Sequence, residues 1–168
     1  MTRATIVLAL LFLCAAAPAQ QPAGAPDTAT KKSNQPDVLK SEQFSDAVAT
    51  ALLSRLADGF TRRNPKLFLS AFEPQHFPGY ALFSDRMRAR LGQNYAFRAY
   101  YRIVSTQSED TRTTVNVELQ VEEDPVTPGP PPVRNTGQAR FTFERGAAGW
   151  KIVDVAPRAL LTGVRGPA

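Results

Sequence analysis

Three segments in the second half of the chain constrain its fold more than any other feature. Residues 113–122, TTVNVELQVE, alternate apolar and polar side chains, and residues 139–144 and 150–155 are rich in β-branched and aromatic residues. A two-residue alternation places one set of side chains on each face of a strand. The pattern therefore predicts strands of an antiparallel sheet with one buried face and one face in water.

Residues 95–103 are predicted to form a further strand of this sheet. Its buried face would carry Tyr95, Phe97, Ala99, Tyr101 and Ile103. Arg98 and Arg102 would lie on the solvent face, where pairing with Glu118 or Gln120 gives a ladder of charges. The polar stretch that follows, residues 105–111, is predicted to turn the chain.

Helical patterns fill the first half of the domain. Apolar residues at nearly four-residue spacing predict a long amphipathic helix, with Phe44, Val48, Leu52, Leu56 and Phe60 on one side. Asn64 is a good N-cap and Pro65 suits the first helical position, so a short second helix starts there and Pro74 stops it. A third helix is marked by Tyr80, Phe83, Met87 and Leu91. We therefore expect an α+β domain at residues 41–161, in which three helices pack on an antiparallel sheet of about four main strands.

Proline marks the connections of the predicted sheet. Residues 124–136 are rich in proline, which cannot donate a hydrogen bond to a sheet ladder. This segment is therefore predicted to be an extended hairpin loop. Pro157 is expected to end the last strand, and residues 162–168 are expected to form a flexible tail.

The first residues have the pattern of an export signal. Arg3 gives a positive start, residues 6–14 form a short apolar stretch, and Ala17 and Ala19 are the small residues that a signal peptidase reads. The apolar stretch is shorter than the roughly 20 residues that cross a bilayer. We expect a signal peptide at residues 1–19 and an exported mature chain, periplasmic or extracellular, without a transmembrane anchor.

Cys14 closes the apolar stretch, where a lipoprotein would carry its acylated cysteine. The lipobox has a small residue directly before that cysteine, whereas this chain has the bulky Leu13, so we expect no lipid anchor. Cleavage after Ala19 would leave no cysteine, and hence neither a disulfide nor a thiolate metal site. Residues 20–40, rich in Pro, Ala, Gln and Thr, are expected to be a disordered leader.

The formal net charge of +5 is a mild excess, and its placement matters more than its size. Two short clusters of basic residues stand out: Arg62, Arg63 and Lys66, and Arg86, Arg88 and Arg90. Acidic residues such as Asp58, Glu73 and Asp85 are interleaved with them. This mixture is typical of solvated helix faces, so we expect no nucleic-acid binding.

The element order and the last strand carry a family resemblance. A long helix, a short helix opened by Asn64-Pro65 and a third helix precede a meander that ends in Gly149-Trp150-Lys151-Ile152. This arrangement resembles the nuclear transport factor 2-like superfamily, which includes ketosteroid isomerase, scytalone dehydratase, polyketide cyclases and many non-catalytic domains. The resemblance implies helices wrapped over a strongly curved sheet, a cone-shaped, cystatin-like roll. In the enzymes, acid and base residues project into the apolar cone, where burial shifts their pKa values.

Asp154 is the residue that could act as such a base. It shares a strand face with Trp150 and Ile152 and could point into the cone; the alternative places Val153 and Val155 inside and leaves Asp154 in water. Periodicity leaves both open. An enzyme of this kind would be a small isomerase, dehydratase or cyclase acting on an apolar substrate, with Asp154 as base.

A largely aromatic set is predicted to line the inside of the cone. Its members are Phe72, His76, Tyr80, Phe83, Tyr95, Phe97, Tyr101 and Trp150. A buried phenol can donate to a developing oxyanion, but more often it fills space. His76, the only histidine, has no identifiable orienting carboxylate in the sequence, and a capped surface histidine is the preferred interpretation. Whether the lining encloses a cavity stays open at this stage.

The chemistry-bearing motifs of common enzymes are not found in the sequence. There is no glycine-rich phosphate loop, nucleophile elbow or metal-spacing cluster, so we expect no metal and no cofactor. We expect a non-catalytic binding or interaction domain whose partner is an unidentified small apolar ligand or protein. Dimerisation through the outer sheet face would be weak, because Arg98, Arg102, Glu118 and Glu122 make that face polar.

Overall fold

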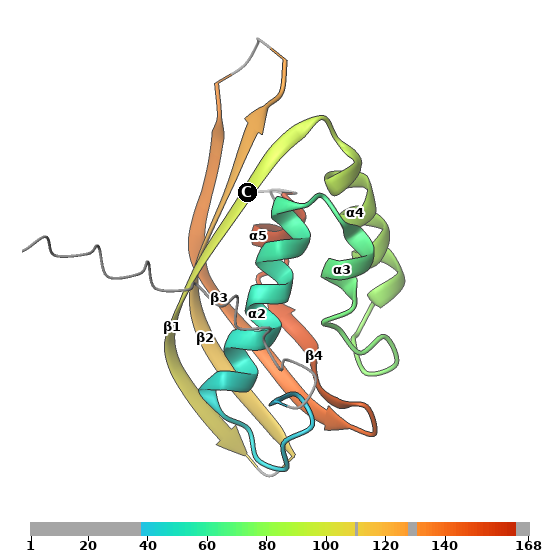
Figure 1. Cartoon of the computed structure of the whole chain (residues 1–168), viewed down its shortest axis with the longest axis vertical. Helices are drawn as coiled ribbons and strands as arrows, with labels where there is room; N and C mark the ends of the chain where they lie inside the picture. Colours follow the sequence, from blue (N-terminus) through green and yellow to red (C-terminus); the bar gives the residue numbers. More distant parts are fainter. Residues whose placement is uncertain (1–37, 110, 128–130, 164–168) are drawn as a thin grey trace, which may run out of the picture. The chain divides into compact units, whose positions relative to one another are not determined.

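The computed structural model describes residues 38–109, 111–127 and 131–163. The predicted signal peptide, Cys14, most of the predicted leader and residues 164–168 of the predicted tail lie outside the described residues. Within the described part, helices lie on one face of a four-stranded antiparallel sheet (Figure 1). This confirms the predicted α+β architecture.

The sheet is a simple meander in the order β1-β2-β3-β4, with every neighbouring pair antiparallel. Its strands are β1 (Tyr95–Glu109), β2 (Arg112–Pro125), β3 (Val133–Gly146) and β4 (Gly149–Ala156). A ladder of charges is present on the outer face, as predicted for Arg102, whereas Arg98 pairs with Glu122 and not with Glu118 or Gln120. Arg102 lies opposite Glu118, with 2.7 Å between Nη2 and Oε2, and Arg98 lies opposite Glu122 with 3.8 Å between Nη1 and Oε2.

In the part of the chain that the structure describes, four helices accompany the sheet: α2 (Asp46–Thr61), α3 (Pro65–Leu69), α4 (Tyr80–Gly92) and α5 (Ala159–Thr162). Asn64 caps α3 as predicted, because its Oδ1 accepts a hydrogen bond from the Leu67 amide at 2.9 Å. The short α5 was not predicted, since four residues show no apolar periodicity. None of the helices in the described residues has the length and apolar character that a bilayer crossing needs.

The predicted turn at residues 105–111 is wrong, because β1 continues through it to Glu109. The pairing register with β2 shifts between Ile103 and Ser105, and Val104 is 49% exposed at that irregularity. Beyond it Ser108 lies opposite the buried Thr113. A bulge inserts one extra residue and exchanges the two faces of the strand. Beyond the bulge, the alternation of apolar and polar residues therefore no longer predicts which face is buried.

The boundaries of the folded domain also differ from those predicted. Leu39, assigned to the leader, is 7% exposed, and its carbonyl accepts a hydrogen bond from the Trp150 amide at 2.8 Å. Gly149, with φ of +104°, permits this approach, because a Cβ there would collide with the Leu39 carbonyl. Thr162, assigned to the tail, is 7% exposed in α5. The folded domain therefore extends on both sides of residues 41–161.

The connection between β2 and β3 is a hairpin, as predicted, but shorter than the predicted segment 124–136. Strand β2 runs to Pro125 and β3 begins at Val133, so residues 126–132 connect them. Glu123 and Val133 are the last paired residues. The ends of β2 and β3 that lead into this connection extend past the helices in Figure 1.

The sheet is not strongly curled, which corrects the cone-shaped sheet that the resemblance implied. Bulges are the features that bend strands most sharply. Here β2 and β3 pair without interruption from Arg112 opposite Glu144 to Glu123 opposite Val133. Register shifts occur at one place in the β1–β2 pair and one place in the β3–β4 pair. The regular central pair therefore keeps the middle of the sheet from rolling up.

Gly59 of α2 lies where α3 crosses closely, and it offers a first test of the packing. A Cβ at this position would lie 2.6 Å from the Phe68 Cβ and 2.7 Å from the Phe68 Cα. We expect Gly59→Ala to lower the free energy of unfolding by about 1–3 kcal/mol through overpacking, although alanine is the better helix former. Urea denaturation measures the change.

The matched control is Gly92→Ala at the end of α4, where no heavy atom lies within 4 Å of the added Cβ. This variant is expected to be neutral or to gain up to about 1 kcal/mol from helix propensity. Equal midpoints for the two variants would contradict the close crossing of α2 and α3.

Candidate functional site

The space between the helices and the inner sheet face, where the resemblance implies a substrate pocket, is filled by side chains. The void found there measures about 10 Å³. It is lined by Leu53, Leu56, Ala57, Phe60, Ala99, Tyr101, Leu119, Phe141 and Leu161. A single water needs at least about 10–15 Å³. The interior of the described domain therefore has no room for an organic ligand.

The predicted aromatic lining exists, but as a packed core. Phe72, Phe83, Phe97 and Trp150 are each at most 4% exposed. The Phe72 ring lies 5.1 Å from Phe83 and 5.5 Å from Phe77, centroid to centroid, in edge-on arrangements. Such contacts add to the burial of the rings themselves. These side chains stabilise the fold and line no interior cavity in the described domain; Trp150 alone of the four also borders an opening at the end of the sheet.

The tyrosines of the predicted lining lie at the border of this core. The Tyr101 hydroxyl lies 2.7 Å from the Ser54 Oγ and donates to the Thr50 carbonyl at 3.3 Å. Tyr95 and Tyr80 pack against the core with part of each ring exposed. The phenol of Tyr101 thus ties β1 to α2, which is the structural role of a partly buried tyrosine.

Tyr80 carries a testable pKa shift. Partial burial raises the pKa of its phenol above the ordinary value of 10.0; nearby Glu73 adds to the rise and Arg88 opposes it. The pKa of Tyr80 is therefore higher in the folded than in the unfolded protein. The contribution of this shift to folding stability is fully present below pH 10.0 and is lost as the pH rises through the folded-state pKa. Ultraviolet titration of the wild type minus Tyr80→Phe should show a phenol ionising above pH 10; a difference curve centred below that value would contradict it.

Asp154 lies at the border of the core and solvent rather than in a pocket. A register shift between Thr142 and Phe143 places both Ile152 and Val155 inside, so each of the two predicted assignments holds for part of β4. The Asp154 side chain is 44% exposed, and its Oδ1 accepts a hydrogen bond from Arg158 Nη2 at 2.8 Å. The carboxylate is therefore solvated and paired, and the described residues around it form no dry cavity of the kind that a catalytic base would need.

His76 does have an orienting carboxylate, which sequence inspection did not reveal. Its Nδ1 lies 2.8 Å from Oε1 of Glu144, whose Oε2 accepts a hydrogen bond from Arg112 Nε at 3.0 Å. The side chain of Glu144 is 18% exposed and that of His76 is 51% exposed. The pair joins the loop after α3 to the outer face of the sheet, a contact between residues far apart in sequence.

A shallow pocket of about 290 Å³ lies beside His76 and includes Glu73 and Lys151. Lys151 Nζ donates to the Ser70 carbonyl at 2.6 Å. Burial lowers the pKa of Lys151, nearby Arg55 lowers it further, and Glu73 opposes the change. Among the described residues, no three His, Cys, Asp or Glu side chains gather in a way that could hold a metal ion.

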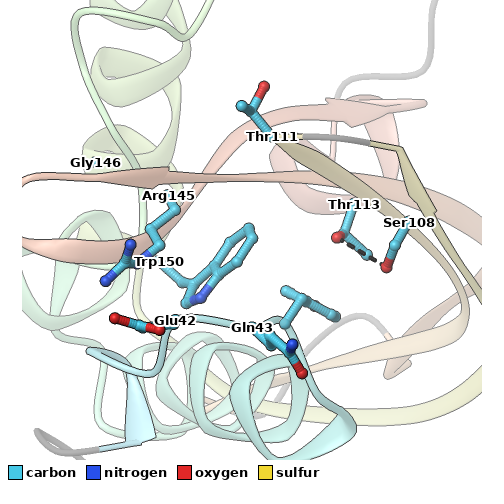
Figure 2. A pocket seen from close by; sticks show the side chains of 9 residues that line it. Glu42, Gln43, Ser108, Thr111, Thr113, Arg145, Gly146 and Trp150 are labelled. Carbon is cyan, nitrogen blue, oxygen red and sulfur yellow. Dashed lines mark hydrogen bonds between the residues drawn. The ribbon is translucent and has the colours of Figure 1, made fainter.

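A more spacious opening of about 570 Å³ lies at the end of the sheet where the β1–β2 and β3–β4 connections are found (Figure 2). We call it the rim pocket. Its lining consists of Glu42, Gln43, Phe44, Ser108, Thr111, Thr113, Arg145, Gly146 and Trp150. Pockets of about 300–1,000 Å³ are typical of sites for small organic ligands.

The rim pocket exists because the sheet is longer than the helix that covers it. Helix α2 starts only at Asp46, so residues 42–44, in non-helical conformation, lie over the last rows of the inner face. The Phe44 ring lies 5.1 Å from both Phe143 and Trp150. The Trp150 indole, 4% exposed, donates to the Ser41 carbonyl at 3.0 Å. The apolar floor is thereby fixed, while the space above it stays open.

Polar side chains surround this apolar floor. Ser108 and Thr113 share a hydrogen bond of 3.2 Å between their hydroxyl oxygens. In the view of Figure 2, the Arg145 guanidinium and the Glu42 carboxylate lie on one side of the indole and this hydroxyl pair on the other. The pocket therefore presents a cation, an anion and hydroxyl groups around aromatic rings.

Sequence reasoning found Trp150 but missed most of the rim pocket. Ser108 belonged to the segment predicted to turn, and Arg145, which lies in β3, was not among the predicted site residues. The register places Arg145 opposite Trp150 and Ser108 opposite Thr113. No local signal marked these pairs, because each arises from strand pairing after an irregularity.

Comparisons with known proteins show relatives of the fold only. No protein-family model matches the sequence, and no curated protein matches it either. A conserved protein from Planctomyces limnophilus DSM 3776 is similar with a TM-score of 0.58 and 13% identity, over 66% of this chain and 91% of that one. A nuclear transport factor 2-like superfamily protein from Salmonella enterica subsp. enterica serovar Typhimurium str. LT2 is similar with a TM-score of 0.53 and 13% identity, over 64% and 84% respectively.

Sequence identities this low indicate a shared fold and do not indicate a shared activity. The element order, the one-sided helical layer and the structural matches agree with each other and with the resemblance seen in the sequence. This chain has the nuclear transport factor 2-like fold.

Proposed function

We propose that this chain is an exported, non-catalytic binding domain that holds its ligand in the rim pocket. The observation that carries the proposal is the contrast between a void of about 10 Å³ in the interior and an opening of about 570 Å³ at the sheet end. A ligand of any size must therefore bind outside the core. The proposed export rests on Arg3, the apolar stretch and Ala19 in the sequence.

The chemistry of the rim pocket favours a partner with polar groups over the small apolar ligand considered from sequence. Its aromatic floor is narrow, since Trp150 is 4% exposed, and charged or hydroxyl side chains make up most of the remaining wall. Buried apolar contact with a few convergent polar groups is the usual composition of a specific site. A segment of a protein partner fits this composition better than a hydrocarbon.

The alternative function, an isomerase, dehydratase or cyclase with Asp154 as base, has less support. A general base must reach its substrate in a site that excludes water. Asp154 is 44% exposed and paired with Arg158. We keep the non-catalytic proposal for that reason.

A thermal-shift screen on the full chain tests the proposed function. One panel contains small apolar compounds and the other contains short peptides and polar metabolites. The first is expected to leave the melting temperature unchanged, and at least one member of the second is expected to raise it. That shift should vanish in Thr111→Trp, which fills the pocket from an exposed position. A saturable shift by an apolar compound that persists in Thr111→Trp would contradict the proposal.

Dimerisation through the outer sheet face is a separate expectation about the same domain. Arg102 and Glu118 already pair within one chain, as do Arg134 and Glu122 at 2.8 Å. The arginines of both pairs are exposed, and ion pairs in contact with water contribute little, so a second copy gains little by covering them. Light scattering is expected to give the monomer mass; a dimer mass that persists on dilution would contradict this.

A further inference from the structure

We infer that the rim pocket takes a short zwitterionic peptide, with a carboxylate bound by Arg145 and an ammonium group bound by Glu42. The inference rests on the proposed function and names the class of ligand for that pocket. It starts from two charged side chains of opposite sign that line the same opening.

Neither of these two charged side chains forms an ion pair within the described fold. Ion pairs elsewhere in the described residues join Arg to Asp or Glu across the sheet and along the helices, and His76 to Glu144. Arg145 and Glu42 have no oppositely charged group within 4.0 Å among the described residues, and both side chains are exposed. Each can therefore exchange water for a charged group of a ligand.

The two side chains suit the two ends of a peptide. A guanidinium offers a planar fork of donors that matches a carboxylate, often with two hydrogen bonds. A carboxylate such as that of Glu42 accepts hydrogen bonds from an ammonium group. A ligand with one sign of charge would meet one attractive and one repulsive group here, whereas a zwitterion satisfies both.

The hydroxyl side of the pocket, across the indole from the two charges, suits the amide groups of a peptide. The Thr111 hydroxyl and the Ser108–Thr113 hydroxyl pair can donate to and accept from amide groups. Phe44, partly exposed and supported by Trp150, offers an aromatic surface to a small side chain. The volume of about 570 Å³ lies in the range of drug-sized ligands, which is the size of a peptide of a few residues.

The test uses four forms of one peptide: trialanine with free ends, its acetylated form, its amide, and the acetylated amide. They share the same apolar content and differ only in their end charges. Isothermal titration with the full chain is expected to give the tightest binding for free trialanine, weakened about tenfold by blocking either end, which is the scale of one charge-assisted hydrogen bond.

Two charge-removing variants locate each end. Arg145→Gln should weaken free trialanine about tenfold yet leave the amide, which has no carboxylate, unchanged. Glu42→Gln should likewise weaken the binding of free trialanine about tenfold. It should leave the affinity of the acetylated form, which has no ammonium group, unchanged. The matched control is Arg140→Gln, an exposed arginine of β3 outside the pocket, which should alter no affinity.

The outcomes separate this inference from the proposed function. Equal binding of all four forms, abolished by Thr111→Trp, would leave the pocket as the binding site and overturn the assignment of the two charges. Failure of every form to bind would also overturn the inference, and the ligand screen would then decide the proposed function alone. Binding that Thr111→Trp leaves intact would overturn both.

Discussion

Phe141→Ala is expected to lower the free energy of unfolding by about 3–5 kcal/mol and to turn the filled interior into a cavity. Phe141 is fully buried on β3, lines the small interior void and packs beside Phe143 with 6.5 Å between ring centroids. Removing its ring deletes buried apolar atoms and leaves a space that the neighbours fill only in part. Urea denaturation gives the stability change.

The same variant tests the interior as a ligand site. An apolar cavity of this kind stays dry and can admit a small aromatic molecule, so benzene is expected to raise the melting temperature of Phe141→Ala and not that of the wild type. Val133→Ala, on the same strand but 47% exposed, serves as the control and should change stability by less than about 1 kcal/mol. A benzene effect on the wild type would show that the interior is not filled.

Arg90→Ala is expected to cost about 3–5 kcal/mol, because it leaves a mostly buried carboxylate without its cation. Arg90 of α4 is 4% exposed and forms an ion pair with Glu123 of β2, which is 15% exposed. Its guanidinium also donates to the carbonyls of Leu160 and Leu161 and lies 5.4 Å from the centre of the Phe60 ring. One side chain thus joins α4, β2, α5 and the core.

Two further variants make this result specific. Arg102→Ala removes an exposed pair with Glu118 and should cost less than about 1 kcal/mol. Arg90→Met combined with Glu123→Leu should recover much of the lost stability, since apolar residues can replace a buried ion pair. If Arg90→Ala unfolds at the same urea concentration as Arg102→Ala, the pair contributes no more than a surface contact.

The parts of the fold that the sequence predicted are those that rest on local patterns. The alternation in residues 113–122 gave β2 its buried face, with Val115, Val117 and Val121 all fully buried. The Asn64-Pro65 start of α3 was likewise correct, because capping depends on neighbouring residues. Periodicity and caps are set within a few residues, so they can be read without knowing the tertiary structure.

The parts that could not be predicted depend on strand pairing. The register shifts near Val104 and in the β3–β4 pair exchange strand faces, so neither the inward side of Ser108 nor the outward side of Asp154 follows from alternation. The contact between His76 and Glu144 joins a loop to a distant strand, and the contact between Leu39 and Trp150 does the same for the domain's first residues. Most of the candidate site is made of such contacts.

The position of Trp150 gives the protein a built-in optical reporter. It is the chain's single tryptophan, and its ring touches Phe44 in the wall of the rim pocket while its nitrogen donates to Ser41. Tryptophan fluorescence therefore comes from one known position. A ligand bound in the rim pocket, or a movement of the residues that line it, changes the surroundings of the indole. Occupancy can be followed at low protein concentration without a dye, a label or a substitution.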